Sequence, residues 1–99
     1  MKAKLVDGGK KIWIDCPGCD GPHVLRLASA FPESPRWTWN GSLEAPTLDP
    51  SIMSSWEHPT DGRQVCHSFV RGGRIEFLGD CTHAMAGKTV DLPEAEVQG

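Results

Sequence analysis

The Cys16-Pro17-Gly18-Cys19 segment constrains this chain more than any other feature. The Cys-x-x-Cys spacing around a Pro-Gly turn lets two sulfurs reach one metal ion, each at about 2.3 Å. A redox Cys-x-x-Cys would instead open a helix after a strand, and no helical pattern follows residue 19. The segment therefore predicts half of a structural metal site, and zinc is the metal that this spacing favours.

The other half of the metal site is expected between residues 66 and 83. Two donors are enough to complete a tetrahedron, and this segment offers four: Cys66, His67, Cys81 and His83. Adjacent residues of a regular strand point to opposite faces, so Cys66 and His67 should not both bind the ion. Two ligand sets stay open. One is Cys16, Cys19, Cys66 and Cys81, and the other replaces one thiolate by His67 or His83. His23, four residues after Cys19, is expected at the surface.

Length and composition favour a small β domain. A chain of 99 residues is too short for two cores, and its 11 Gly and 8 Pro suit many turns. We expect a mainly β, zinc-stapled antiparallel domain with little helix. It should occupy residues 1–93 and be followed by a flexible tail at 94–99.

Two hairpins can be placed from the pattern. Residues 11–15 and 23–27 should pair with the cysteine knuckle at the tip, and 65–70 should pair with 75–78 across Gly72-Gly73. In that second register Cys66 shares a face with Ser68, Val70, Ile75 and Phe77, Cys81 continues on that face, and His67 lies on the other. Residues 44–53, interrupted by prolines, read as an edge or crossing strand, and residues 56–64 read as a polar loop.

Charge and hydropathy exclude some classes of function. The net charge is −3 and the basic residues are dispersed, which argues against a nucleic-acid binder. No apolar run approaches the ~20 residues of a membrane span, and the N-terminus lacks a signal-peptide core. Four cysteines used as thiolate ligands point to the cytoplasm.

The expected function is that of a zinc-binding module with a protein partner, rather than an enzyme. Trp37 and Trp39 lie at strand spacing and are the candidates for partner contact. One alternative is a small zinc hydrolase with His67, Asp80 and His83 around an open metal position. A second alternative is a zinc ribbon that binds nucleic acid through its scattered basic residues. The sequence contains no obvious nucleophile–base–acid set, and it does not indicate an oligomeric state.

Two segments carry a family resemblance. Residues 37–52, WTWNGSLEAPTLDPSI, resemble a W-T-(F/W)-N-G-x-L-x-x-P-T-x-x-P-S signature, and residues 66–83 read CHSFVRGGRIEFLGDCTH. They resemble a small domain-of-unknown-function family frequent in tailed phages and prophages, with relatives beside bacterial ubiquitin-like conjugation genes. Its members often carry the label "ammonia monooxygenase", which does not suit a chain with no membrane span. The resemblance implies that His67 and His83 recur and that position 81 can be Ser, which favours histidine in the ligand set.

Overall fold

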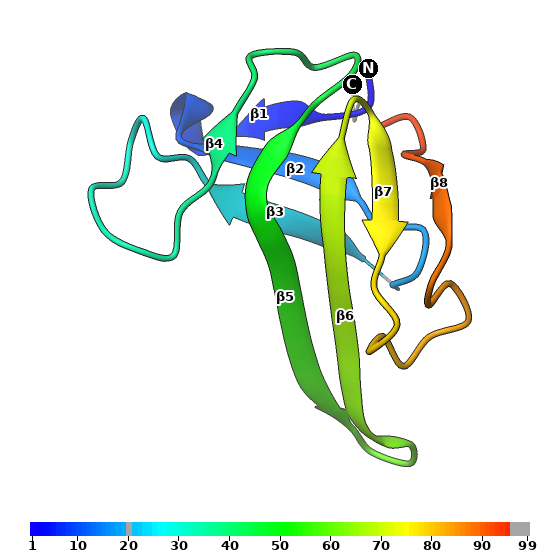
Figure 1. Cartoon of the computed structure of the whole chain (residues 1–99). Helices are drawn as coiled ribbons and strands as arrows, with labels where there is room; N and C mark the ends of the chain where they lie inside the picture. The colour runs from blue at the N-terminus through cyan, green and yellow to red at the C-terminus, as the bar shows by residue number, and fades with distance from the viewer. Residues whose placement is uncertain (20, 96–99) are drawn as a thin grey trace.

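The computed structural model describes residues 1–19 and 21–95, which form two antiparallel sheets packed as two layers (Figure 1). The small sheet has the order β1-β2-β3, and the large sheet has the order β4-β5-β6-β7-β8. A single turn of 3₁₀ helix, η1, covers Asp7–Gly9. The strands are β1 Lys4–Val6, β2 Lys11–Asp15, β3 Pro22–Arg26, β4 Thr38–Trp39, β5 Leu48–His58, β6 Gly62–Arg71, β7 Arg74–Phe77 and β8 Thr89–Asp91.

The small sheet presents the cysteine knuckle. In β2 and β3 buried residues alternate with partly or fully exposed ones, because the pleat turns every second side chain toward the other sheet. The register pairs Asp15 with Pro22, so both knuckle cysteines lie in the connection between these two strands. The predicted hairpin with the cysteines at its tip is confirmed.

The β6–β7 hairpin has the predicted register. Arg71 pairs with Arg74 and Val70 with Ile75, and both turn glycines, Gly72 and Gly73, have positive φ as a primed turn requires. Burial alternates along β6, so that Cys66 faces inward and His67 faces the opposite side.

The prediction of a polar loop at residues 56–64 is wrong. β5 continues to His58 and β6 begins at Gly62, so most of this segment forms the end of a long hairpin that extends beyond the small sheet (Figure 1). Its residues are polar because both faces are exposed there, and cross-strand hydrogen bonds satisfy the backbone without an apolar pattern.

The core lies between the two sheets and combines apolar side chains from both layers with three of the four cysteines. Its buried members are Ala3, Ile12, Ile14, Cys16, Leu25, Leu27, Leu48, Ile52, Cys66, Val70, Ile75, Phe77, Cys81 and Leu92. The prediction of a mainly antiparallel β domain with almost no helix is confirmed.

The ends of the chain meet beside this core. Ala95 is buried, and its N–H donates to the carbonyl of Met1 at 2.8 Å, so the start of the predicted tail is held in place. The rest of that tail, residues 96–99, lies outside the described residues. In the described part of the chain, no helix has the length and apolar character needed to cross a membrane.

Candidate metal centre and candidate active site

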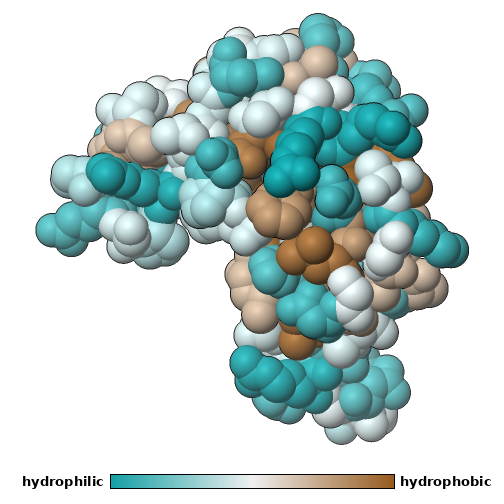
Figure 2. All heavy atoms as spheres, viewed as in Figure 1, coloured by the Kyte–Doolittle hydropathy of each residue, from teal (hydrophilic) through white to brown (hydrophobic). Residues whose placement is uncertain are grey.

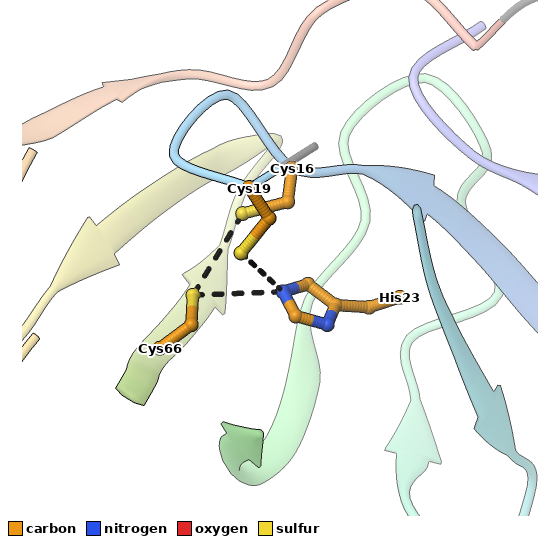
Figure 3. Close-up of side chains that lie close together, drawn as sticks. All are labelled: Cys16, Cys19, His23 and Cys66. Atoms are coloured by element: carbon orange, nitrogen blue, oxygen red, sulfur yellow. Dashed lines mark hydrogen bonds between the residues drawn. The ribbon is translucent and has the colours of Figure 1, made fainter. Parts of the chain in front are cut away.

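Four side chains from two sheets converge at the rim of the core (Figure 3). Cys16 and Cys19 come from the knuckle, His23 from β3, and Cys66 from β6. The Sγ atoms of Cys16 and Cys66 are 3.8 Å apart, and His23 Nε2 lies 3.7 Å from Cys66 Sγ and 4.0 Å from Cys19 Sγ. All four donor atoms lie within 4.8 Å of one another, so they could hold one metal ion.

These separations fit a tetrahedral ion. Two sulfurs at about 2.3 Å from one tetrahedral ion lie about 3.8 Å apart, and a sulfur and an imidazole nitrogen lie about 3.5 Å apart. Three of the donors are buried and the fourth, Cys19, is half-buried, so water has limited access to the centre of the group.

The thiols of this group perturb one another. The hydrogen bond with Cys66 lowers the pKa of Cys16 to about 4. Burial raises the pKa of Cys19 to about 11, and the hydrogen bond to Cys16 followed by burial raises the pKa of Cys66. Deprotonation of one thiol in this group therefore makes deprotonation of the neighbouring thiols less favourable. A bound divalent cation removes that conflict, because it stabilises every coordinated thiolate.

His23 was expected at the surface, and that expectation is wrong: it is 7 % exposed. Its position in β3 has the same parity as Leu25, and both side chains point between the sheets. The alternation of residues 23–27 contained this signal, because His23 stands where an inward-facing apolar residue would.

His83 also lies next to this group, in contact with Cys66. Its Nδ1 accepts a hydrogen bond from the N–H of Met85 at 3.2 Å, which leaves the proton of the neutral ring on Nε2. Nε2–H can then donate to Cys66 Sγ, 3.4 Å away. The ring also packs against Gly18, where an added Cβ would lie 2.6 Å from Nε2. His83 is thus placed to support the thiolate of Cys66 by a hydrogen bond.

A second constellation lies on the other face of β6. His67 Nδ1 is 3.0 Å from Asp80 Oδ2, and His67 Nε2 is 3.2 Å from Ser51 Oγ. A carboxylate only accepts, so Nδ1 carries the proton, and Nε2 can accept from the Ser51 hydroxyl. The imidazole side chain is 25 % exposed and the Asp80 side chain 52 %. A hydroxyl, an imidazole and a carboxylate in this order form a Ser-His-Asp triad.

Local irregularities of the sheet place the two partners of His67. Leu48 pairs with Val70 but Ile52 pairs with Ser68, so three residues of β5, 49–51, bulge opposite a single residue of β6. Two extra residues preserve the alternation, so Ser51 has the same parity as Met53, which pairs with His67, and the bulge bends the strand locally where Ser51 lies. Asp80 comes from the loop that follows β7 and lies against β6, where Leu78 N–H donates to the carbonyl of His67 at 2.9 Å.

A comparison with known families places this chain. The model of the family described as "Bacterial ubiquitination-like system serine protease (BubE)" matches residues 2–78, which are 77 of the 99 residues. The chain belongs to the BubE family. The expected association with bacterial ubiquitin-like conjugation is confirmed by this membership. The match includes Ser51 and His67 and ends before Asp80. No curated protein and no solved structure matches the chain.

The predicted metal ligands do not all lie in one group: most lie in the candidate metal groups, and His67 lies with Ser51 and Asp80. The structure brings together Cys16, Cys19 and Cys66, three of the four residues of the first predicted ligand set. Cys81 lies with Cys66 and His83 in a second, overlapping group, and its Sγ contacts the main chain of His67. The ring nitrogens of His67 face Ser51 and Asp80, and His67 belongs to neither candidate metal group among the described residues.

The two candidate partner-contact residues are half-buried against the core. Trp37 Nε1–H donates to the carbonyl of Ser51 at 3.3 Å, and Trp39 Nε1–H donates to the carbonyl of Ser42 at 2.9 Å. Trp37 therefore supports the backbone of the bulge.

Ser51 was missed by the sequence reasoning. No motif marks it, because the three triad residues are separated along the chain and meet only through the bulge and the loop after β7. The available signal was indirect: Ser51 is the last residue of the P-T-x-x-P-S signature, next to a proline that interrupts the strand.

Proposed function

We propose that this chain is a serine hydrolase in which Ser51 is the nucleophile, His67 the general base and Asp80 the group that orients the imidazole. One observation carries the proposal, namely the continuous hydrogen-bonded series from Ser51 Oγ through both ring nitrogens of His67 to Asp80 Oδ2. It replaces the expectation of a pure binding module.

The geometry supports a stepwise acyl transfer. Ser51 Oγ attacks the substrate carbonyl carbon while His67 Nε2 takes the hydroxyl proton, and Asp80 stabilises the imidazolium that forms. The same Nε2–H then protonates the departing nitrogen or oxygen as the carbonyl bond to it breaks. A water molecule, deprotonated by His67, attacks the acyl-serine, and the proton returns to Ser51 Oγ as the acid product leaves.

The substrate class follows from the family and from the surface. A family named for a serine protease of a bacterial ubiquitination-like system points to an amide or ester carbonyl of a protein. Apolar surface is present along the middle of the outer face of the large sheet (Figure 2). Met53, paired with His67 in the register, is 58 % exposed and offers an apolar contact for a polypeptide next to the nucleophile.

We propose zinc as the metal and a structural role for it, with Cys16, Cys19, His23 and Cys66 as ligands. Three thiolates and one imidazole in a tetrahedral arrangement suit zinc better than harder cations. When bound, the ion supplies a cross-link between the two sheets, and the acid–base work stays with His67 and Asp80. This ligand set differs from the predicted one in the replacement of Cys81 by His23.

The remaining expectations become part of this proposal. The protein partner is the substrate itself, with Trp37 supporting the catalytic bulge and Trp39 the loop beside it. A cytoplasmic location and a phage or prophage origin stay predictions.

A fluorophosphonate probe tests the activity. Ser51 Oγ of the purified chain should displace fluoride from the probe and become phosphonylated, and intact mass and peptide mapping would report one phosphonyl group on Ser51. Ser51→Ala should abolish labelling. Ser55→Ala is the matched control, since Ser55 is on the same strand and bonds Arg63 instead of His67. Labelling that persists in Ser51→Ala, or no labelling of the wild type, refutes the proposed function.

A further inference from the structure

The strand pairing of the His67 main chain is incomplete on one side. On its β5 side His67 pairs with Met53. On its β7 side the regular pairing ends at Ser68 with Phe77, and the next residue, Leu78, still donates its N–H to the carbonyl of His67 at 2.9 Å. A position beside the N–H of His67 is thus left for an acceptor, and an unpaired peptide donor there would be costly.

Cys81 fills that position. Its Sγ lies 3.2 Å from the N–H nitrogen of His67 and 3.2 Å from the carbonyl oxygen of the same residue. A thiol can accept from the N–H and donate its S–H to the carbonyl, so one side chain bonds both main-chain groups of the catalytic base. Cys81 is only 8 % exposed, which shields these weak bonds from water.

The residue before Cys81 is the carboxylate of the triad. The loop that holds both is fixed along β6 by further bonds. Cys81 N–H donates to the carbonyl of Leu78 at 3.3 Å, and Thr82 N–H donates to the carbonyl of Val65 at 3.0 Å. Thr82 Oγ1 accepts in return from Val65 N–H at 2.9 Å. Fixing Cys81 against His67 therefore also fixes the distance between Asp80 and the imidazole.

We propose that Cys81 is a positioning residue of the triad, which holds the backbone of His67 and the Asp80 loop in register, and that it is not a metal ligand. This inference rests on the proposed hydrolase function for its catalytic consequence. The contact itself does not depend on that function.

The competing role for Cys81 is coordination, because it also lies near Cys66 and His83. A metal-bound thiolate has no proton to donate, so coordination would remove the bond to the His67 carbonyl. The group of Cys16, Cys19, His23 and Cys66 already supplies four donors without it. The two roles therefore predict different behaviour of the metal when Cys81 is changed.

Two substitutions separate the roles. Cys81→Ser keeps a group that both donates and accepts, whereas Cys81→Ala removes both bonds. Each variant and the wild type would be measured for zinc per chain, for the rate of fluorophosphonate labelling, and for amide hydrogen exchange at His67. His23→Ala serves as the control for loss of a proposed ligand.

Both Cys81 variants should keep about one zinc per chain, while His23→Ala should lose it. Cys81→Ala should be labelled about tenfold more slowly or worse, because the loss of two hydrogen bonds loosens the base and its carboxylate. Its His67 amide should exchange faster, with Val70 as an internal reference on the same strand. Cys81→Ser should stay within about threefold of the wild type in labelling.

Loss of zinc from Cys81→Ser overturns the inference, and so does wild-type labelling of Cys81→Ala. If Cys81→Ala does not fold, the zinc content and labelling rate of Cys81→Ser decide the matter alone. A wild type that is never labelled refutes the hydrolase, and hydrogen exchange and zinc content then still decide between the contact with His67 and coordination.

Discussion

Changing Cys66 to Ser should disconnect the two sheets at the metal centre. Cys66 is fully buried on β6, and the donors that face it, Cys16, Cys19 and His23, all belong to the small sheet. The variant keeps the shape of the side chain but supplies a poor ligand, so the ion should be lost. The proposed metal would then no longer join segments that are distant along the chain.

The size of the effect follows from the loop that the metal closes. Cys16 and Cys66 are 50 residues apart. Closing a loop of that length in the unfolded chain costs about 4 kcal/mol by the entropy relation used for disulfides, and a metal that binds only the folded state gains a similar advantage. The free energy of unfolding of domains of this size is about 5–15 kcal/mol, so the metal cross-link would supply a large share of it. The melting temperature should fall by roughly 15–30 °C.

Thermal unfolding followed by far-UV circular dichroism measures this loss. Cys16→Ser should lower the melting temperature by the same amount as Cys66→Ser, because either change breaks the same metal cross-link. The double variant should be no worse than either single one, whereas two independent core contacts would give additive losses. A strong chelator should lower the melting temperature of the wild type to that of Cys66→Ser, and it should leave the melting temperature of Cys66→Ser unchanged. Additive losses, or a wild type that melts at the same temperature with and without chelator, would refute the cross-link.

Three further predictions concern single side chains. Asp80→Asn should lower kcat by roughly 10²–10⁴ with little change in KM, since an amide no longer holds the imidazole in the required tautomer; steady-state hydrolysis of an activated ester measures it, and an unchanged kcat contradicts the assignment. Gly18→Ala should release the metal faster in a chelator competition, because its Cβ would lie 2.6 Å from His83 Nε2 and displace the donor to Cys66; equal release rates would dismiss that role of His83. Trp37→Phe should slow fluorophosphonate labelling about fivefold by removing the bond to the carbonyl of Ser51, worth about 1 kcal/mol, while the melting temperature shifts by only a few degrees; a labelling rate equal to that of the wild type would show that Trp37 does not support the bulge.

Features that depend on local spacing could be predicted from the sequence. The Pro-Gly knuckle sets the distance between two sulfurs within four residues, and Gly72-Gly73 sets the register of the hairpin that contains Cys66. The placement of Cys66 and His67 on opposite faces follows from that register and from strand alternation. These features were correct because each depends on neighbours in the chain.

Features that depend on irregular or long-range geometry could not be predicted in the same way. Ser51 lies in a bulge, and the backbone path through a bulge cannot be read from the pattern of a regular strand. Asp80 reaches His67 through a loop with no periodic pattern. The polar hairpin at 56–64 was mistaken for a loop because exposure on both faces removes the alternation that marks a strand.

The period of two along β6 explains how the candidate metal centre and the proposed catalytic base can share so small a domain. Cys66 and His67 are consecutive, so one points between the sheets and the other to the outer face. The same arrangement recurs at Asp80 and Cys81, where an exposed carboxylate adjoins a buried thiol. Each catalytic group is therefore joined by one peptide unit to a side chain held in the interior. A small domain can in this way hold the partly exposed imidazole and the exposed carboxylate of the proposed triad in place through the buried residues next to them.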